Sequence, residues 1–460
     1  MTLNRREFLK GSAAVAATGL GAWTLPIGCR SSVRRDPSTI VLITLDTTRV
    51  DHLGCYGYAR PTTPSLDRLA ERSVVYDRAI APGTWTLPSH ASLFTGKFPT
   101  SHGARYDPEG SFRLSAAIKD NPRFDRFRAR SLALEETTLA ELLRSAGYLT
   151  GAVIAGPWLN RFFRLNEGFD HYDDNNTNSY NGRAAGEVTD GALSWLEATA
   201  GSPRFLFVNY FDPHSPYAPP EEFARRFVPA SEPLPTHPGQ YSSRVQAVGL
   251  YDAEICYMDR HFGRLIEGLR ELGLYDGAWI IITSDHGELL GEHGERSHGD
   301  TPYQEVVHVP LVVKEPGAPT PRRSDQWIQL TEIMPMILAR LEMPLPPEIQ
   351  GSVPPSIDHP IVVESQTLPE LMENGSWLAL IDDQGMKFIW NSQGRHKLFD
   401  LMQDPREQRD LVAQLPDRAR TMQETATRYL AGLPRPGEQI TDQVIDPETE
   451  KALESLGYVK

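Results

Sequence analysis

Three apolar stretches of this chain each end in side chains that can hold a metal ion or move a proton. Continuous apolar runs of this kind predict strands buried on both faces, as in a parallel sheet. The carboxyl ends of such strands share one edge of the sheet, where ligands collect. An Asp or His at one strand end often only caps the next turn, but three such ends together predict a site. Asp46 follows residues 39–45, Asp212 and His214 follow residues 204–210, and Asp285 and His286 follow residues 278–284.

A hydroxyl that could act as a nucleophile lies in the segment 86–93. Pro88 suits the first turn of a helix, so Thr86 is predicted to lie just before a helix N-terminus. Free backbone N–H groups at such an end favour an anion, for example a sulfate or phosphate group under attack by Thr86. A lone Thr in this position would more simply be the N-terminal cap of the helix.

The elements that must position these residues alternate along the chain. Helical patterns at 138–147, with a capping box from Thr138 to Glu141, and at 247–272 separate the apolar runs. We therefore predict an α/β fold, with a large, mainly parallel sheet sandwiched by helices. Residues 107–130 lack a clear period and indicate a surface insertion.

A smaller C-terminal α+β domain is predicted beyond a proline-rich boundary at residues 344–355. Short strand candidates at 361–363, 377–381 and 386–390 precede a polar helix near 416–430. The predicted domains are an export signal (1–29), a linker (30–38), a catalytic domain (39–345) and a C-terminal subdomain (355–460).

The N-terminus resembles a twin-arginine export signal. Asn4-Arg5-Arg6 precedes a weakly apolar Ala/Gly-rich run, which is too short and too Gly/Ala-rich to favour a membrane anchor. The protein is therefore expected outside the cytoplasm, in the periplasm or beyond it, after passing the twin-arginine export machinery. Cys29 follows a degraded lipoprotein box, so a lipid anchor there and plain cleavage near Gly28 are about equally expected.

Composition limits the partners. The 460 residues carry 46 Lys+Arg and 60 Asp+Glu, a net charge of −14, which argues against a nucleic-acid partner. A locally positive site for an anionic substrate remains compatible with this charge. Of the three cysteines, Cys55 and Cys256 remain after export, and two buried free thiols are preferred over a pair between them. The sequence indicates no oligomeric state.

The chain from Thr39 to Lys460 resembles the sulfatase family, a branch of the alkaline phosphatase superfamily. Several separated motifs carry the resemblance in the family's order. They are Leu45-Asp46-Thr-Thr-Arg49-Val-Asp51-His52-Leu-Gly54, Thr86-Leu-Pro-Ser-His90-Ala-Ser-Leu-Phe-Thr95-Gly96, Phe211-Asp-Pro-His214-Ser-Pro-Tyr217, Thr283-Ser-Asp285-His286-Gly287-Glu288, Leu398-Phe-Asp400-Leu401 and Leu456-Gly-Tyr458.

Departures from the family pattern bear on the reaction. Sulfatases have a Cys (or Ser) that is oxidised to formylglycine, followed at the fifth motif position by Arg; this chain has Thr86 and His90 there. Threonine cannot give that aldehyde, so no formylglycine is expected. Thr47 replaces a second aspartate, and the family's Gly-Lys-x-His element is missing. Related lipoteichoic acid synthases use an unmodified Thr on a phosphodiester.

The resemblance implies one divalent metal ion held by Asp46, Asp285, His286 and the Thr86 oxygen. Sulfatases more often have Asn at the position of His286, with calcium. Because imidazole suits transition metals, Mn²⁺ is preferred, with Ca²⁺ or Zn²⁺ as alternatives.

The resemblance also suggests roles beside the metal. His214 matches an anion-binding histidine, and His298 stands where it could protonate the leaving alcohol, although it could instead be a solvated loop residue. His90 is a further catalytic candidate. Arg49 and Lys97 are candidates for binding the substrate anion, with a surface role at least as plausible.

The resulting hypothesis is attack of Thr86 on a sulfur or phosphorus centre of an anionic ester, for example one of a glycan or lipid, followed by transfer to water. Missing formylglycine chemistry favours phosphodiesters or phosphonates, while the family label favours sulfate esters. A phospho-group transferase and a retired sulfatase fold that only binds an anionic glycan or lipid are the alternatives.

Overall fold

The computed structural model describes residues 38–434, apart from 108–109, 111, 114, 116, 120–121, 123–126, 318–319, 356–358 and 366–374. The predicted export signal, Cys29 and the motif at residues 456–458 therefore lie outside the described residues. Within the described ranges, no helix combines the length and the apolarity needed to cross a membrane.

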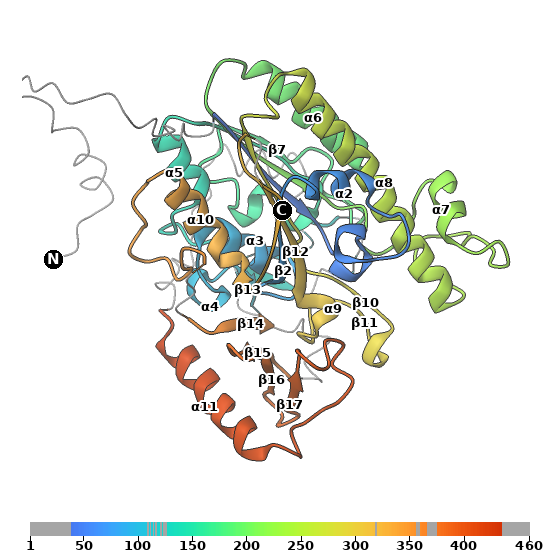
Figure 1. Ribbon diagram of the computed structural model, residues 1–460, viewed down its shortest axis with the longest axis vertical. Coiled ribbons are helices and arrows are strands. Elements are labelled where there is room, and N and C mark those ends of the chain that lie inside the picture. The colour runs from blue at the N-terminus through green and yellow to red at the C-terminus, as the bar shows by residue number, and fades with distance from the viewer. Residues whose placement is uncertain are drawn as a thin grey trace, which may run out of the picture. The chain divides into compact units, whose positions relative to one another are not determined.

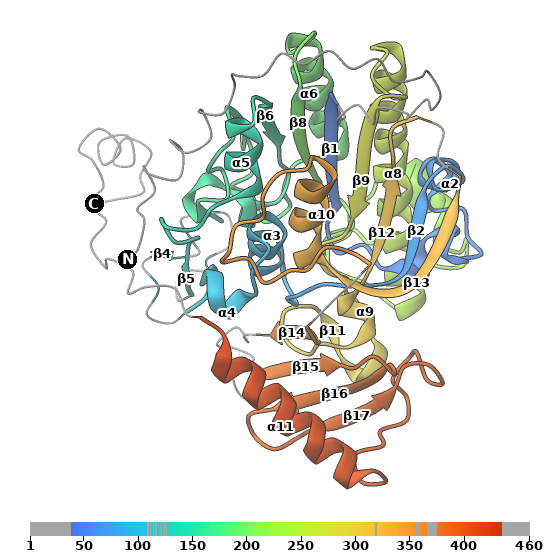
Figure 2. The same ribbon diagram turned by 60° about the vertical axis from the view of Figure 1, so that its left-hand side comes forward.

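The central sheet has eight strands among the described residues, in the order β13-β2-β12-β9-β1-β8-β6-β7. Figure 1 shows this sheet nearly edge-on with helices on both sides, and Figure 2 shows most of its strands side by side. Only β12 runs antiparallel to its neighbours, so the sheet is mainly parallel, as predicted. The strands are β1 (Thr39–Leu45), β2 (Val74–Ile80), β6 (Leu149–Val153), β7 (His171–Asp173), β8 (Arg204–Tyr210), β9 (Ala278–Thr283), β12 (His308–Lys314) and β13 (Arg322–Gln329).

Helices cover both faces of this sheet, and β1 shows why. Its side chains alternate between two cores: Ile40 and Leu42 pack with one set of helices, whereas Val41 and Ile43 pack with the other. A strand buried on both faces needs apolar residues at every position, which explains the continuous run. The first set is α3 (Thr86–Thr95), α5 (Leu139–Ser145) and α10 (Ile333–Arg340); the second is α2 (Pro64–Ala70), α6 (Ala185–Ala198) and α8 (Arg244–Glu271).

Local signals placed several of these helices correctly. The capping box at the start of α5 is present, with Thr138 and Glu141 bonded reciprocally. The helix predicted at 247–272 is α8, which begins three residues earlier because Ser243 caps it. Shorter elements are α4 (Pro99–His102), α7 (Glu221–Phe227), α9 (Gln304–Val307), β10 (Leu289–Leu290) and β11 (Arg296–Ser297).

A four-stranded antiparallel sheet follows the proline-rich segment (Figure 2). One face packs on Ile80 and the α9 region, and the other face packs on α11. The predicted C-terminal α+β part is thus present, while its boundary at 344–355 stays a proposal. Its elements are β14 (Ile361–Ser365), β15 (Trp377–Ile381), β16 (Met386–Asn391), β17 (Lys397–Asp400) and α11 (Pro416–Gly432).

The segment predicted as a surface insertion, 107–130, is only partly described. It contributes two strands to a three-stranded sheet, and several of its described side chains are buried. The strands of this sheet are β3 (Arg105–Tyr106), β4 (Phe112–Arg113) and β5 (Arg128–Arg130).

Candidate active site

Adjacent strand ends bring the two aspartates together. β1 lies between β8 and β9 in parallel register, so Asp46 and the residues after Thr283 emerge at one edge of the sheet. The Asp46 N–H donates to the Tyr210 carbonyl (2.9 Å), which extends the β1–β8 ladder to the first residue beyond the strand. This arrangement confirms that the strand ends converge.

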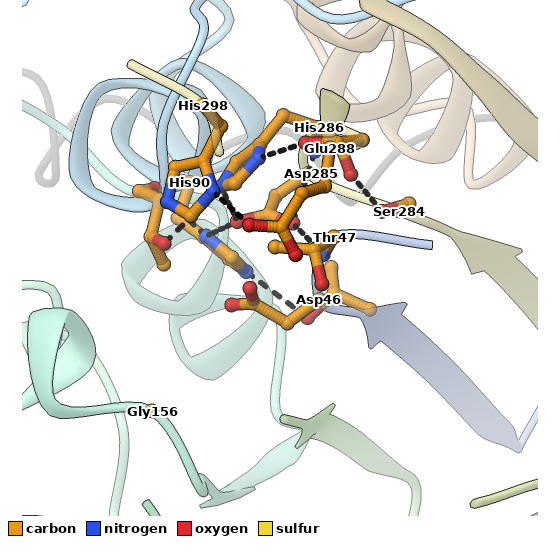
Figure 3. Close-up of polar contacts among 12 residues, drawn as sticks. Asp46, Thr47, His90, Gly156, Ser284, Asp285, His286, Glu288 and His298 are labelled. Atoms are coloured by element: carbon orange, nitrogen blue, oxygen red, sulfur yellow. Dashed lines mark hydrogen bonds and ion pairs between the residues drawn. The ribbon is translucent and has the colours of Figure 1, made fainter. Parts of the chain in front are cut away.

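Asp46, Asp285 and His286 form a buried group of hydrogen-bond acceptors. Their ligand atoms lie within 4.8 Å of one another, and all three side chains point into a common space (Figure 3). Among the described residues, no hydrogen-bond donor satisfies either oxygen of Asp46 or Oδ2 of Asp285. Buried acceptors without donors are costly unless a cation faces them.

The tautomer of His286 fits the same picture. Its Nδ1 lies 2.9 Å from the Gly287 carbonyl and donates to it, which leaves the Nε2 lone pair facing Asp285 Oδ2 at 3.3 Å. Burial lowers the pKa of His286 to about 4, so the ring is neutral near pH 7. Two carboxylates and a neutral imidazole, with the second nitrogen held by a carbonyl, fit a divalent transition metal ion.

Thr86 is the first residue of α3, and its side chain does not cap the helix. The sequence predicted that Thr86 lies just before the helix, whereas in the structure the helix begins at Thr86 itself. Pro88 still lies in the first turn, where its missing N–H breaks no bond. Thr86 Oγ1 lies 3.3 Å from His286 Nε2, beside the acceptor group. The hydroxyl therefore sits between a helix N-terminus and the metal-ligand candidates.

The charges of the two aspartates are strongly coupled. Burial, and then the charges of Asp285 and Glu288, raise the pKa of Asp46 well above its ordinary value. Burial also acts to raise the pKa of Asp285, but the neighbouring His286 and His90 outweigh it and hold that pKa below its ordinary value. A site that cannot easily keep both carboxylates charged gains from a bound cation.

Two further histidines complete the site. The ring centroid of His298 lies 4.4 Å from that of His286 and 5.0 Å from that of His214. His214 stacks on Phe211 and donates from Nδ1 to the Ser215 carbonyl (2.6 Å). Burial, reinforced by the charge of His298, lowers the pKa of His214 to about 3, so its Nε2 is an acceptor.

Comparison with known proteins decides the family. The family model described as "Sulfatase" matches residues 38–343, about two thirds of the chain. The chain belongs to the sulfatase family. This confirms the resemblance seen in the sequence and agrees with the alkaline phosphatase-like sheet.

Individual relatives are distant. Human iduronate 2-sulfatase is 26% identical over 61% of this chain, and the match spans 60% of that protein's length. An arylsulfatase of Clostridium perfringens is 23% identical over 81% of this chain and 90% of its own. The phosphonate monoester hydrolase of Agrobacterium radiobacter has a similar structure, with a TM-score of 0.66, 20% identity and coverage of 86% of this chain and 96% of that one. A structure solved with D-glucosamine-2-N,6-O-disulfate as its substrate gives a TM-score of 0.70 at 19% identity, covering 88% and 100%.

The N-terminal signal is also matched. A model of the twin-arginine translocation signal covers residues 2–22. This supports the predicted export of this sulfatase-family protein, while the lipid anchor at Cys29 stays a prediction.

Two predicted substrate-binding residues are paired elsewhere. The Arg49 guanidinium is buried and donates to Asp51 (2.8 Å), to Glu292 (3.0 Å) and to the Glu288 carbonyl (3.0 Å). Lys97 lies beyond the far end of α3, roughly 15 Å along the helix from Thr86, and its Nζ pairs with Glu136 at 2.7 Å. The structure does not bring either cation to the acceptor group.

His90 and Asp212 are engaged with the protein itself. His90 donates from Nδ1 to the Thr86 carbonyl (2.9 Å), approaches Asp285 Oδ2 (3.5 Å), and accepts at Nε2 from Thr44 (3.0 Å). Both of its ring nitrogens are therefore used in hydrogen bonds within the protein. Asp212 accepts from the Ala185 N–H (3.0 Å) at the start of α6, the capping role that an Asp at a strand end often has.

Sequence reasoning assigned no role to Glu288 and Tyr217. Glu288 is buried, and its Oε1 lies 3.3 Å from His298 Nδ1 while its Oε2 accepts from the Tyr217 hydroxyl (2.6 Å). Burial acts to raise the pKa of Glu288, but the His298 bond lowers it below its ordinary value. The sequence did contain one signal for a role of Glu288: it lies two residues after His286, in the same motif.

Cys55 and Cys256 are free thiols in the structure, as preferred from the sequence, but only Cys256 is buried, whereas Cys55 is half-buried.

Proposed function

We propose that this chain is an exported, metal-dependent hydrolase that cleaves monoanionic esters of sulfate or phosphorus, with Thr86 as the nucleophile. The observation that carries the proposal is the Thr86 hydroxyl beside Asp46, Asp285 and His286. Both oxygens of Asp46 and Oδ2 of Asp285 are buried there without a donor among the described residues. Asp46, Asp285, His286 and Thr86 would hold one divalent ion, for which we favour Mn²⁺. The ion would supply positive charge that lowers the pKa of the hydroxyl.

The chain's own residues perform the remaining steps. Thr86 Oγ forms a bond to sulfur or phosphorus while the bond to the ester oxygen breaks; the hydroxyl proton leaves to water, and the departing oxygen takes a proton from His298 Nε2. Water then attacks the same centre and gives a proton to His298, while the bond to Thr86 breaks and Thr86 Oγ takes back a proton from solvent water. The neutral His214 offers an acceptor, which suits a substrate hydroxyl or the attacking water; it stabilises an anion only after taking up a proton.

The charge of the site supports a monoanionic substrate. Among the described residues, the ion pairs and hydrogen bonds of the acceptor group and of His214 and His298 involve no Lys or Arg side chain. Two aspartates balance a divalent ion, so a second negative charge on the substrate would meet no further fixed cation. Sulfate monoesters, phosphodiesters and phosphonate monoesters carry one charge, whereas phosphate monoesters near neutral pH carry nearly two.

Relatives suggest the organic part of the substrate. One neighbouring structure holds a disulfated glucosamine, and a relative from Formosa agariphila is an ulvan-active sulfatase. A sulfated sugar is thus our first candidate for the physiological ester, encountered in the periplasm or outside the cell.

The test uses four p-nitrophenyl esters: the sulfate, the phenylphosphonate, the bis-ester of phosphate and the phosphate monoester. Enzyme treated with chelator and then reloaded with Mn²⁺ is compared with Thr86→Ala and with Thr86→Ser, which keeps a hydroxyl. We expect turnover of at least one monoanion, a loss of about 10³-fold or more in Thr86→Ala, and much milder loss in Thr86→Ser. The dianion should be about tenfold slower or worse, because its second negative charge loses water on binding and meets no further fixed cation in return.

Three results would count against the proposal. Full activity of Thr86→Ala would remove Thr86 as the nucleophile, and preference for the dianion would refute the charge argument. Tight Mn²⁺ binding without turnover of any ester, including sulfated sugars, would favour a retired fold that binds an anion.

A further inference from the structure

Glu288 connects a core tyrosine to the histidine beside the acceptor group. Its side chain is 1% exposed, and the two carboxylate oxygens have different partners. Oε2 accepts from the Tyr217 hydroxyl at 2.6 Å, and Oε1 faces His298 Nδ1 at 3.3 Å. Because Tyr217 can only donate here, the carboxylate cannot turn without breaking that bond, and Oε1 stays aimed at the imidazole.

His298 needs such a partner because its backbone does little to fix the ring. It follows the two-residue strand β11, between Ser297 at φ +76° and Gly299 at φ +95°. Its side chain is 12% exposed, so it reaches the site from the surface side, with its ring 4.4 Å from that of His286. Figure 3 shows Glu288, His286 and His298 close together at this point.

The hydrogen bond also selects a nitrogen. A carboxylate oxygen accepts only, so Nδ1 of His298 must carry the proton that faces Glu288. Nε2 is then the nitrogen left for the substrate. Glu288 does not serve Arg49 through its side chain, because Arg49 donates to its backbone carbonyl. The side chain therefore has no visible duty among the described residues except to hold His298 and Tyr217.

We propose that Glu288 is a positioning residue that holds His298 with Nε2 directed at the leaving oxygen, and that Tyr217 fixes the carboxylate for this task. The inference rests on the proposed function, because it concerns how the departing alcohol receives its proton. In the step itself His298 carries a proton on both nitrogens: the Nε2 proton passes to the ester oxygen as the bond from that oxygen to sulfur or phosphorus breaks, and the ring is left neutral with Nδ1–H on Glu288. Glu288 keeps its own charge and donates nothing.

The test exploits the leaving group. A p-nitrophenolate departs readily without a proton, whereas phenol and 4-methoxyphenol depend on one. Aryl esters of the class that the enzyme turns over are measured with the Mn²⁺-loaded protein and its variants. In Glu288→Gln, Tyr217 still donates to the amide oxygen, so the amide NH₂ faces Nδ1 and cannot accept from it. We expect kcat for the 4-methoxyphenyl ester to fall about 10²-fold, a typical contribution of a general acid, with KM nearly unchanged and the p-nitrophenyl ester slowed only a few-fold.

Matched variants isolate the role. His298→Ala should show the same dependence on the leaving group, and Glu288→Gln with His298→Ala should be no worse than His298→Ala alone. Tyr217→Phe, which removes only the fixing bond, should give the same trend at smaller size and remains informative if Glu288→Gln does not fold. Glu292→Gln is the control, because that carboxylate pairs with Arg49 and Arg244 rather than with a histidine.

The outcomes separate the two proposals. If Thr86→Ala retains activity, the proposed function fails irrespective of Glu288. If Thr86 is essential but Glu288→Gln slows all aryl esters equally, changes only KM, or behaves as wild type, the positioning role is overturned and the nucleophile stands.

Discussion

Replacing Asp46 with Asn should make the metal-free protein more stable and the metal-loaded protein comparatively less stable. In the structure, both oxygens of Asp46 are buried without a donor among the described residues, and its ligand atom lies within 4.8 Å of those of Asp285 and His286. An amide has nearly the same shape but carries no charge. The substitution therefore removes repulsion without opening a cavity.

The size of the effect follows from the spacing. Two like charges no more than 4.8 Å apart repel by about 3 kcal/mol or more at an effective dielectric constant of 20. Because burial and the charge of Asp285 raise the pKa of Asp46, the native state binds a proton there more readily, and protonation would relieve part of this repulsion. We expect Asp46→Asn to raise the free energy of unfolding of the metal-free protein by roughly 1–3 kcal/mol.

A bound ion should reverse the order of stability of the two proteins. A ligand at 100 times its dissociation constant stabilises the native state by about 2.7 kcal/mol. Wild type should gain this on addition of Mn²⁺, whereas Asp46→Asn, with one charged ligand fewer, should gain little. The variant is thus ahead in chelator and loses that lead in Mn²⁺.

Urea unfolding in chelator and in excess Mn²⁺ measures both differences without any substrate. Asp212→Asn is the control: this aspartate accepts from Ala185 N–H rather than facing the acceptor group, so the response to Mn²⁺ should stay as in wild type. The reasoning is refuted if Asp46→Asn is less stable than wild type in chelator, or if Mn²⁺ stabilises it as much.

Two further predictions concern buried charges in the C-terminal part. Lys387→Met should cost roughly 3–5 kcal/mol of stability, because it leaves Glu407 buried without the cation now 2.8 Å away. Denaturant unfolding measures this loss, and the exposed Arg420→Met is the control, which should lose less than about 0.5 kcal/mol. Equal losses of stability in the two variants would contradict the argument. Burial raises the pKa of Glu364 to about 7, so the native state binds its proton more tightly and wild-type stability should fall as pH rises from about 4.5 to 7. Relative to Glu364→Gln, which does not titrate, the fall should approach 3 kcal/mol; parallel pH profiles of the two proteins would disprove it.

Sequence periodicity was enough for the centre of the fold. Strands buried on both faces must be apolar throughout, so β1, β8 and β9 stood out, and their parallel arrangement sent Asp46 and Asp285 to one edge. Local capping chemistry located the start of α5 at Thr138, since the capping box needs only residues within one turn.

The outer part of the sheet was harder to predict from the sequence. β13 reads as a mixture of charged and apolar residues, because several of its side chains are exposed where the strand forms the sheet edge. β12 runs against its neighbours, a choice of direction that depends on the connections and leaves no mark on the strand's own composition. Propensity alone does not determine such tertiary choices.

Partners distant in sequence explain what could not be predicted in the site. The sequence named His298 but not the carboxylate that orients it, because Tyr217, Glu288 and His298 meet only after folding. Conversely, Arg49 was a reasonable anion ligand by type, yet folding places Asp51 and Glu292 around its guanidinium. Residue type identifies what a group can do, and only its neighbours determine whether it is free to do it.

The site therefore divides into two parts with different requirements. Asp46, Asp285 and His286 offer only acceptors and need a cation; Glu288 and His298 form a donor–acceptor pair that can handle a proton without one. Their separation has a measurable consequence: chelation should slow every ester, including those with good leaving groups, whereas loss of Glu288 should slow only esters whose alcohol needs a proton. If both perturbations produced the same dependence on the leaving group, the two parts would act as one unit, and the division of roles argued from their contacts would be wrong.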